Sequence, residues 1–273
     1  MLLAFDVGNT NIVMGLYDGK VLKGSWRMET NQKKSADEYA VFIRQLFDTH
    51  GFTFKDVDDV IISTVVPSMT YTLQHMCRYY FSCEPMIVGP GIKTGLIIKY
   101  DNPKMLGADR IVNSVAAVAK YPAPLIIIDC GTATTFCAVS DKNEYLGGAI
   151  APGLKISSEA LFEKTAKLPR VEIEVPKKSI CHNTTEGMQA GLVFGHIGMA
   201  KYIVDRMKDE IHAAYGSDKH ITVIGTGGMA YIIKDNSDCI DVLDKMLTLE
   251  GLLLIYEKNK SEERIKPEEK PAE

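Results

Sequence analysis

The chain has 273 residues, 46% of them hydrophobic and 24% charged, with a formal net charge of −4. This balance is typical of globular proteins and excludes a mainly disordered, collagen-like or mucin-like chain. Because the net charge is mildly negative, no general surface for polyanions is implied, and we expect no nucleic acid partner.

The first half opens with a short apolar strand that runs into a glycine turn, Asp6-Val7-Gly8-Asn9-Thr10-Asn11. An Asp-Gly pair then gives a strong hairpin signal between two further strands. Ser35 and Glu38 make a capping box ahead of an apolar helical face, which predicts a helix. The predicted elements are strands at 2–5, 12–17 and 21–27, a helix at 35–51, a strand at 60–66, a helix at 68–81 and a strand at 85–88.

The second half starts in the same way. An apolar strand at residues 125–128 runs into Asp129-Cys130-Gly131-Thr132-Ala133-Thr134, so both turns read Asp-x-Gly-x-x-(Asn or Thr), about half a chain apart. The elements predicted after this turn are strands at 136–140 and 144–150, helices at 154–162 and 185–215, a strand at 221–224, a helix after Gly228, a strand at 240–243 and a final helix at 246–256.

Strands that alternate with helices indicate an α/β protein, and the repeated start indicates two duplicated domains, each roughly βββαβαβ. We expect an amino-terminal domain over residues 1–120, a carboxyl-terminal domain over 121–258 and a solvated, charged tail over 259–273. No apolar run approaches the roughly 20 residues that span a bilayer, and the first residues do not read as a signal peptide. We therefore expect a cytoplasmic protein with no membrane partner.

Two strands joined by an Asp-x-Gly turn can bind phosphate. The glycine permits a positive φ and a close approach of a ligand to the backbone, while backbone N–H groups and Asn or Thr side chains hold phosphate oxygens. The aspartate can hold Mg²⁺, directly or through water, and Mg²⁺ bridges to phosphate. One such turn alone is more simply a plain β-hairpin. Two copies that face a shared cleft favour a clasp for a nucleoside triphosphate.

A third glycine turn, Gly225-Thr226-Gly227-Gly228, follows a predicted strand and opens a helix. This is a good place for a nucleoside or for backbone contacts to phosphate. An ordinary strand-to-helix turn has the same pattern, so that alternative stays open. The turn completes neither a G-x-G-x-x-G fingerprint nor a Walker A loop.

The segment Gly107-Ala108-Asp109-Arg110 stands at the start of a predicted helix at residues 110–120. Locally, Asp109 is most simply the helix N-cap. The alternative makes Asp109 a general base on a substrate hydroxyl and Arg110 a fork for a carboxylate or phosphate. By the same local standard, Tyr100 is a packing residue and Thr184 a helix cap.

Together these segments resemble the type III pantothenate kinases, which belong to the superfamily of sugar and acetate kinases, Hsp70 and actin. The Asp-x-Gly turns indicate only the superfamily, whereas the Gly-Ala-Asp-Arg and Gly-Gly-x-Ile-x-Pro-Gly segments are much more specific. The resemblance covers Met1 to about Tyr256 and implies duplicated ribonuclease H-like (actin-like ATPase) domains with a cleft between them. It rests on the two Asp-x-Gly turns, Gly107-Ala108-Asp109-Arg110, Gly147-Gly148-Ala149-Ile150-Ala151-Pro152-Gly153 and Asn183-Thr184-Thr185-Glu186-Gly187.

The resemblance also implies an activity, the ATP-dependent phosphorylation of pantothenate to 4'-phosphopantothenate. This is the first step of coenzyme A biosynthesis, and Asp109 would be its general base. ATP with Mg²⁺ would bind a first loop and Thr132, and Asp129 would help to hold a monovalent cation, K⁺ or NH₄⁺. The family is homodimeric, with the substrate pocket near the interface. The loop would comprise Asp6, Val7, Gly8, Asn9, Thr10, Asn11, Ile12 and Val13, and pantothenate would contact Tyr100, Gly107, Ala108, Asp109, Arg110 and Thr184.

Two other functions remain open. The first is a non-catalytic transcription accessory factor on the same fold, which would not need a general base such as Asp109. The second is another small-molecule kinase of the superfamily, such as a sugar kinase, or an exopolyphosphatase. The chain is shorter than most proteins of that second group, which favours the pantothenate kinase interpretation.

Overall fold

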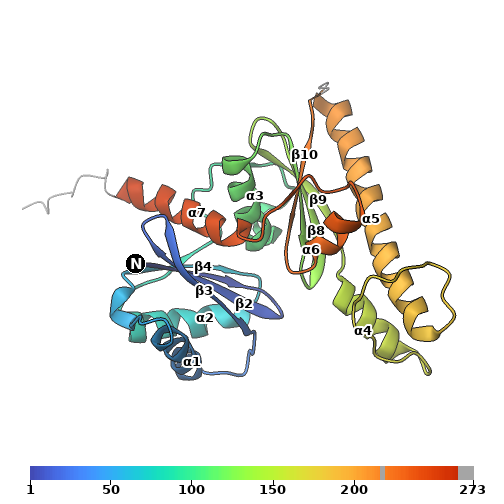
Figure 1. The fold of residues 1–273 in the computed structure, drawn as a ribbon. Coiled ribbons are helices and arrows are strands. Elements are labelled where there is room, and N and C mark those ends of the chain that lie inside the picture. Colours follow the sequence, from blue (N-terminus) through green and yellow to red (C-terminus); the bar gives the residue numbers. More distant parts are fainter. Residues whose placement is uncertain (216–218, 264–273) are drawn as a thin grey trace, which may run out of the picture. The chain divides into compact units, whose positions relative to one another are not determined.

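The structure, a computed structural model, describes residues 1–215 and 219–263, which form two compact units (Figure 1). Unit 1 comprises Met1–Gly95, Lys104–Ala116 and the described residues from Thr248 onward. Unit 2 comprises Leu96–Pro103 and the described part of Ala117–Leu247. The units therefore interleave along the sequence, whereas the sequence predicts two contiguous domains.

Unit 1 contains a five-stranded sheet in the order β3-β2-β1-β4-β5. Strand β1 pairs antiparallel with β2 and parallel with β4. The chain order βββαβαβ predicted for the first half is confirmed. The strands are β1 (Leu2–Val7), β2 (Asn11–Asp18), β3 (Val21–Glu29), β4 (Asp59–Thr64) and β5 (Met86–Ile87), and the first helices are α1 (Ala36–Asp48) and α2 (Pro67–Met76). Shorter helical segments follow at Phe54–Asp56, Cys77–Phe81 and Pro103–Met105.

The two faces of this sheet have different coverings. Because side chains alternate along a strand, Leu3, Phe5 and Val7 of β1 point to one face and fill a core with α1 and α2. Figure 1 shows these two helices on one side of the sheet and α7 on the other. The face opposite α1 and α2 carries Asp6, so this aspartate does not point into the main core of unit 1.

Unit 2 repeats the arrangement. Its sheet has the order β11-β10-β7-β8-β9-β6, which is the order of unit 1 with β6 added at one edge. The duplication predicted from the sequence is thereby confirmed. The strands are β6 (Ile97–Ile98), β7 (Leu125–Cys130), β8 (Ala133–Val139), β9 (Glu144–Pro152), β10 (Thr222–Thr226) and β11 (Val242–Leu243), and the helices are α4 (Leu154–Lys164), α5 (Thr184–Tyr215) and α6 (Ala230–Asn236).

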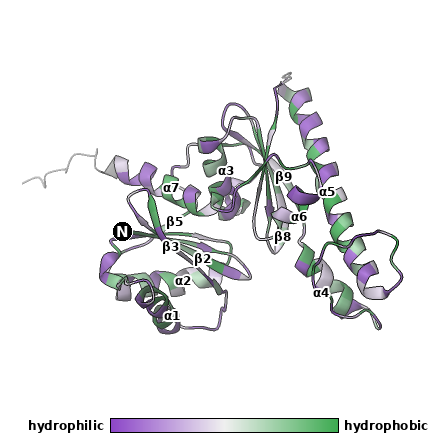
Figure 2. Ribbon diagram, in the orientation of Figure 1, coloured by the Kyte–Doolittle hydropathy of each residue, from purple (hydrophilic) through white to green (hydrophobic). Residues whose placement is uncertain are grey.

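The long helix α5 packs on one face of this second sheet. Ile126, Ile128 and Cys130 of β7 share a buried cluster with Ala200 and Val204 of α5. Figure 2 shows α5 with hydrophilic and hydrophobic segments alternating along its length, while the strands of the sheets are predominantly apolar. One side of α5 therefore faces the core, and another side is left for solvent or a partner.

Several helices differ from their predicted bounds: the helix predicted at 68–81 is divided into α2 and the Cys77–Phe81 segment, and α3 (Ala108–Lys120) and α7 (Leu247–Glu263) are longer than predicted. Helix α3 begins two residues earlier than expected. Helix α7 continues to Glu263, so the first residues of the predicted tail are helical, and residues 264–273 lie outside the described part of the chain. Among the residues described, no helix combines the length and apolar character needed to cross a membrane.

Candidate functional site

The first glycine turn joins β1 to β2 and is braced from the end of β3. The N–H of Gly8 donates to the carbonyl oxygen of Asn11 at 3.0 Å, which closes the turn. Thr30, just after β3, donates from its hydroxyl to the carbonyl of Gly8 at 2.7 Å and from its N–H to the carbonyl of Thr10 at 2.9 Å. The turn is therefore held in one shape, with Asn9, Thr10 and Asn11 exposed.

The glycine of this turn is needed for space and not for a left-handed backbone. Glycine permits a positive φ, but neither Gly8 nor Gly131 has one. A Cβ on Gly8 would instead lie 3.1 Å from the Asn11 carbonyl oxygen, which is tighter than most such contacts. The two turns therefore do not use this conformational freedom of glycine.

The predicted phosphate loop, residues 6–13, divides into exposed and buried parts. Val7 and Ile12 are fully buried in the core of unit 1, so only their backbone groups remain for a ligand. Asp6 and Val13 are opposite one another in the β1–β2 register and are half-buried.

The second glycine turn, in unit 2, is one residue shorter than the first. Asp6 is opposite Val13 in the first hairpin, whereas Asp129 is opposite Thr135 in the second. The N–H of Gly131 donates to the carbonyl of Ala133 at 3.1 Å, so Thr132 alone stands at the tip. Thr132 thus corresponds to Asn9 of the first turn, counted from the aspartates.

Gly153, directly after β9, braces the second turn as Thr30 braces the first. Its N–H donates to the carbonyl of Thr132 at 3.1 Å. A Cβ at this position would lie 2.4 Å from the Thr132 carbonyl oxygen and 2.5 Å from that of Gly131. Only glycine fits here, and the Gly-Gly-x-Ile-x-Pro-Gly segment ends on it. Neither Gly153 nor Thr30 is among the site residues predicted from the sequence. The Gly-Gly-x-Ile-x-Pro-Gly segment is a sequence signal for Gly153, and no signal points to Thr30.

The third glycine turn lies against the second. Gly227 has a φ of +86°, and a Cβ there would lie 2.6 Å from Oδ1 of Asp129 and 2.7 Å from the backbone of Cys130. The N–H of Met229 reaches the carbonyl of Cys130 at 3.4 Å. Unit 2 therefore brings Asp129 and the two glycine turns into one place, at the carboxyl ends of β7 and β10.

Asp109 lies in the first turn of α3, not at its N-cap. Helix α3 begins at Ala108, and Oδ1 of Asp109 accepts the N–H of Arg110 at 2.8 Å. The N-cap interpretation is therefore wrong, although the carboxylate still satisfies one backbone N–H of the helix start. Burial raises the pKa of Asp109 above its ordinary value, and the N–H and charge of Arg110 act in the opposite direction.

The start of α3 meets the carboxyl ends of β1 and β4 inside unit 1. A Cβ on Gly107 would lie 2.5 Å from Oδ1 of Asp109 and 3.7 Å from Val65. Val65 follows β4, and its N–H donates to the carbonyl of Val7 at 3.1 Å, next to the first glycine turn. Unit 1 thus gathers Asp109 and the predicted phosphate loop at one end of its sheet, where open α/β sheets usually bind ligands.

The remaining predicted substrate residues belong to unit 2. Tyr100 is half-buried, with its ring edge-on to Tyr145 at 6.2 Å between centroids, which agrees with the packing interpretation. Asn183 caps α5, because its side-chain oxygen accepts the N–H of Glu186 at 2.9 Å. The helix-cap interpretation of Thr184 is therefore wrong, and Thr184 stands exposed in the first turn of α5.

Comparison with known families identifies the family of the chain. A model of the type III pantothenate kinases matches residues 2–206, three quarters of the chain.

The chain belongs to the type III pantothenate kinase family.

It is therefore an enzyme, a kinase that uses ATP with a divalent metal and belongs to coenzyme A biosynthesis.

Solved structures share the fold of this type III pantothenate kinase family member at low sequence identity. A conserved protein of Campylobacter jejuni, described as a Baf family transcriptional activator, has a TM-score of 0.61 and 17% identity, covering 95% of this chain and 99% of that one. The ethanolamine utilization protein EutJ of Carboxydothermus hydrogenoformans has a TM-score of 0.53 and 15% identity, with coverages of 93% and 89%. A Porphyromonas gingivalis protein described as an N-acetylglucosamine kinase has a TM-score of 0.50 and 12% identity, covering 95% and 100%. These matches show the fold, and they confirm the expected duplicated ribonuclease H-like architecture.

The side chains of this kinase that could bind a metal are suited to a metal ion that binds together with its nucleotide. Within residues 1–215 and 219–263, no cluster of three or more His, Cys, Asp or Glu side chains could hold a metal alone. Mg²⁺ at phosphate sites usually keeps water and takes one or two carboxylates plus phosphate oxygens. Asp6, half-buried beside an exposed turn, fits that requirement as a single carboxylate.

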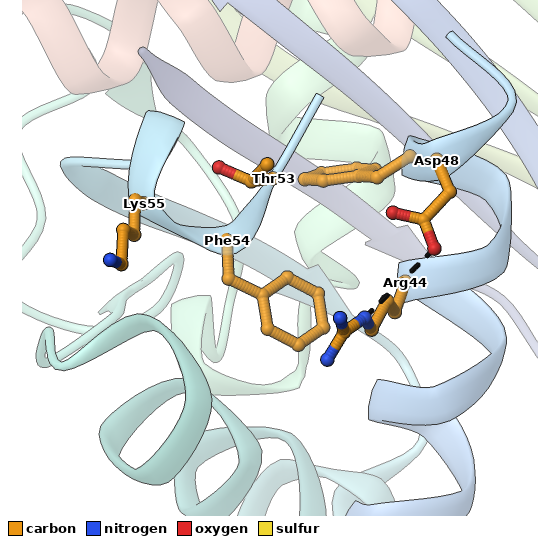
Figure 3. Close-up of a pocket in the computed structure, with 6 residues that line it drawn as sticks. Arg44, Asp48, Thr53, Phe54 and Lys55 are labelled. Atoms are coloured by element: carbon orange, nitrogen blue, oxygen red, sulfur yellow. Dashed lines mark ion pairs between the residues drawn. The ribbon is translucent and has the colours of Figure 1, made fainter. Parts of the chain in front are cut away.

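Two surface pockets of unit 1 lie away from these residues. One pocket of about 330 Å³ lies between α1 and the Phe54–Asp56 segment, where Figure 3 shows Arg44 directed toward Asp48, 3.9 Å away. Another, of about 520 Å³, is lined by residues of β4, β5 and α7. Neither is lined by a predicted site residue, so neither pocket marks the site.

Proposed function

We propose that the chain transfers the γ-phosphoryl group of ATP to the primary hydroxyl of pantothenate, giving 4'-phosphopantothenate and ADP as the first step of coenzyme A biosynthesis. Membership of the family supports this reaction. The main structural support for its mechanism is the environment of Asp109. This carboxylate stands at the end of the unit 1 sheet, beside the predicted phosphate loop. Its raised pKa makes it a better proton acceptor than an ordinary aspartate.

Asp109 is the general base in this proposal. It accepts the hydroxyl proton as the new O–P bond forms, while the bond to the ADP oxygen breaks and its electron pair leaves with ADP. In phosphoryl transfer most of the charge lies on the phosphoryl oxygens, so positioning and electrostatics carry most of the catalysis. A proton acceptor within hydrogen-bond reach adds about 10²–10⁴-fold.

The first glycine turn is assigned to the ATP phosphates. Its Gly8 N–H is already used within the turn, so the exposed residues Asn9, Thr10 and Asn11 supply the contacts. Asp6 is the carboxylate that would hold Mg²⁺, and this ion supplies positive charge against the phosphoryl oxygens when bound. Thr132, at the tip of the second turn, is assigned to ATP from unit 2.

Pantothenate contacts are assigned to Gly107, Ala108 and Arg110 in unit 1 and to Tyr100 and Thr184 in unit 2. Arg110 is 5% exposed and stands next to Asp109. A guanidinium is a planar fork that matches a carboxylate, which pantothenate carries. The carboxylate of the substrate is therefore assigned to Arg110.

A monovalent cation, K⁺ or NH₄⁺, is assigned to Asp129. Support comes from Gly227, whose backbone approaches Asp129 so closely that a Cβ on this glycine would lie 2.6 Å from Oδ1. Hard cations prefer oxygen ligands, and a carboxylate surrounded by the backbone of two glycine turns provides them. The neighbouring Thr226 adds a hydroxyl on the adjacent strand.

A homodimer is the proposed assembly, and α5 is its proposed contact. Four exposed glycines share one side of this helix, and within the described residues no atom beyond their local backbone lies within 4 Å of a Cβ built on any of them: Gly187, Gly191, Gly195 and Gly198. Glycine inside a helix costs about 1 kcal/mol relative to alanine. A second copy packed closely against this side explains why glycine stands there. Thr184 precedes Gly191 by two helical turns and lies on the same side, so this contact would place a partner next to it.

The test is ADP release by the purified chain with ATP and Mg²⁺, with and without pantothenate, in K⁺ and then in Na⁺ buffer. Release that requires pantothenate and is much faster in K⁺ supports the reaction and the cation site together. Folded protein without pantothenate dependence in either buffer contradicts the proposal. A screen of sugars and polyphosphate would then separate another kinase or an exopolyphosphatase from a non-catalytic accessory factor.

A further inference from the structure

Strand β4 carries a buried hydroxyl that satisfies no hydrogen bond. Ser63 is 0% exposed, and its Oγ has no partner among the residues that the structure describes. Burying an unpaired hydroxyl destabilises the folded chain, and alanine would fill nearly the same space without that cost. The hydroxyl therefore needs another explanation than packing.

The strand register places this hydroxyl beside the aspartate of the first glycine turn. Strands β1 and β4 are parallel, and Ser63 pairs with Asp6. Paired residues on neighbouring strands point to the same face of a sheet, with their Cβ atoms about 5 Å apart. Ser63 is thus the immediate neighbour of the carboxylate assigned to Mg²⁺, on the sheet face opposite α1 and α2.

The second sheet has the same pair. Strand β10 is the counterpart of β4 and is parallel to β7, and Thr226 pairs with Asp129. Thr226 is 2% exposed. Each Asp-x-Gly turn therefore has a buried hydroxyl residue beside its aspartate, a serine in unit 1 and a threonine in unit 2.

We propose that Ser63 is a positioning residue for Asp6, its hydroxyl donating to the Asp6 carboxylate when metal and nucleotide are bound, and that Thr226 serves Asp129 in the same way. This rests on the proposed role of Asp6 toward the metal–nucleotide. A carboxylate that takes part in holding a cation needs a fixed orientation, and a neighbouring donor fixes it. The buried hydroxyl is then without a partner only in the free chain.

The test compares the full chain with a Ser63→Ala variant by two measurements. The first is the unfolding temperature of the free protein, which we expect to stay the same or rise, because an unsatisfied hydroxyl has been removed. The second is the calorimetric Kd for ATP in excess Mg²⁺, which we expect to rise about tenfold, a typical effect for a hydrogen bond to a charged group. Without divalent metal, the two proteins should bind ATP equally.

Two further variants sharpen the comparison. Ser63→Thr keeps the hydroxyl and copies the second sheet, so it should restore the Kd to within about threefold of the original, given the tolerance of β-strands for threonine. Ser140→Ala is the matched control, because Ser140 is also buried but its hydroxyl is satisfied by Glu144 at 3.1 Å. It should lower the unfolding temperature and leave the Kd unchanged.

Three outcomes overturn the inference. One is a Ser63→Ala protein that unfolds earlier but binds MgATP normally, which makes the role structural. Another is equal weakening with and without Mg²⁺, which means a general distortion of the turn. The third is an unsubstituted chain that binds no MgATP, which also removes the proposed function. An unsubstituted chain that binds MgATP but phosphorylates no pantothenate contradicts the proposed function alone.

Discussion

The backbone N–H of Gly153 donates to the carbonyl of Thr132 at 3.1 Å, and the same oxygen lies 2.4 Å from where a Cβ on Gly153 would stand. Gly153, directly after β9, therefore holds the tip of the second glycine turn in place. Only glycine fits at this position. The hydrogen bond fixes the position of the Thr132 carbonyl. In unit 1 the side chain and N–H of Thr30 perform this task at the first turn.

Gly153→Ala should therefore move Thr132 and weaken ATP binding. The added methyl group meets backbone oxygens, which cannot rotate away, so the turn itself must shift. We expect KM for ATP to rise about tenfold or more, with a smaller effect on KM for pantothenate, since a displaced contact costs at least one charge-assisted hydrogen bond. Steady-state kinetics measure both constants. Gly89→Ala is the control, because nothing lies within 4 Å of its Cβ position; equal effects of the two variants would contradict the argument.

Asp109→Asn should abolish most turnover without harming the fold. Asparagine keeps the oxygen that accepts the N–H of Arg110 but cannot take a proton from the substrate hydroxyl. We expect kcat to fall by about 10²–10⁴-fold, with an unchanged Kd for MgATP and an unfolding temperature at neutral pH that is not lower. Full activity in this variant would remove Asp109 as the base.

The pH dependence of kcat/KM should also report the ionisation of Asp109. The general base must be unprotonated, so kcat/KM should fall as pH falls, with an apparent pKa above the ordinary aspartate value of about 3.9. Burial raises the pKa of Asp109 in the folded chain. Its contribution to stability is therefore fully present below the unfolded-state pKa and is lost as pH rises through the folded-state pKa.

This sign gives an independent check by thermal unfolding. Asp109→Asn should gain stability relative to the unsubstituted chain as pH rises above the ordinary aspartate pKa of about 3.9 and the buried carboxylate, whose pKa is raised, ionises. A constant difference over this rise in pH would mean that Asp109 ionises as an exposed aspartate does. The fall of kcat/KM at low pH would then have to come from the ionisation of another group.

The repeated strand order, the two Asp-x-Gly turns and their half-chain spacing were predictable from the sequence. Local patterns carry this information, because apolar periodicity and turn residues act over a few positions. The braces were not predictable: Thr30 and Gly153 act through backbone hydrogen bonds to segments 20 or more residues away. The N-cap expectation for Asp109 failed for a related reason. Asp109 fits a cap by composition, but helix α3 already begins at Ala108, and the start of this helix packs near Val65, which is more than 40 residues away in the sequence.

Helix α7 lies beyond residues 2–206, the part matched by the family model, yet it packs against α3 close to Asp109. A Cβ on Gly251 would lie 2.2 Å from the carbonyl oxygen of Val112, and Thr248 donates from its hydroxyl to the side-chain oxygen of Asn113 at 2.7 Å. These contacts fall one helical turn after Asp109. The crossing of the two helices therefore helps to set the position of the α3 start.

Gly251→Ala should force these helices apart. An exposed helical glycine replaced by alanine gains about 1 kcal/mol, but here overpacking against a backbone oxygen should cost about 1–3 kcal/mol and reverse the sign. We expect a lower free energy of unfolding in denaturant titrations, together with a reduced kcat. A more stable variant would show that α3 and α7 are further apart at Gly251 than the structure indicates.

Gly191→Arg tests the proposed dimer contact on α5. The arginine enters the open side of the helix, so it should not disturb the fold of a single chain, while a second copy packed against the glycines would have no room for it. We expect the unsubstituted chain to have twice the chain mass by light scattering and the variant to have the mass of one chain. Glu210→Gln is the control and should stay dimeric. It lies at an exposed position further along α5 and alters the net charge by the same amount and sign as Gly191→Arg. An unsubstituted chain of single mass contradicts the dimer, and a Gly191→Arg protein that remains dimeric places the contact on another face.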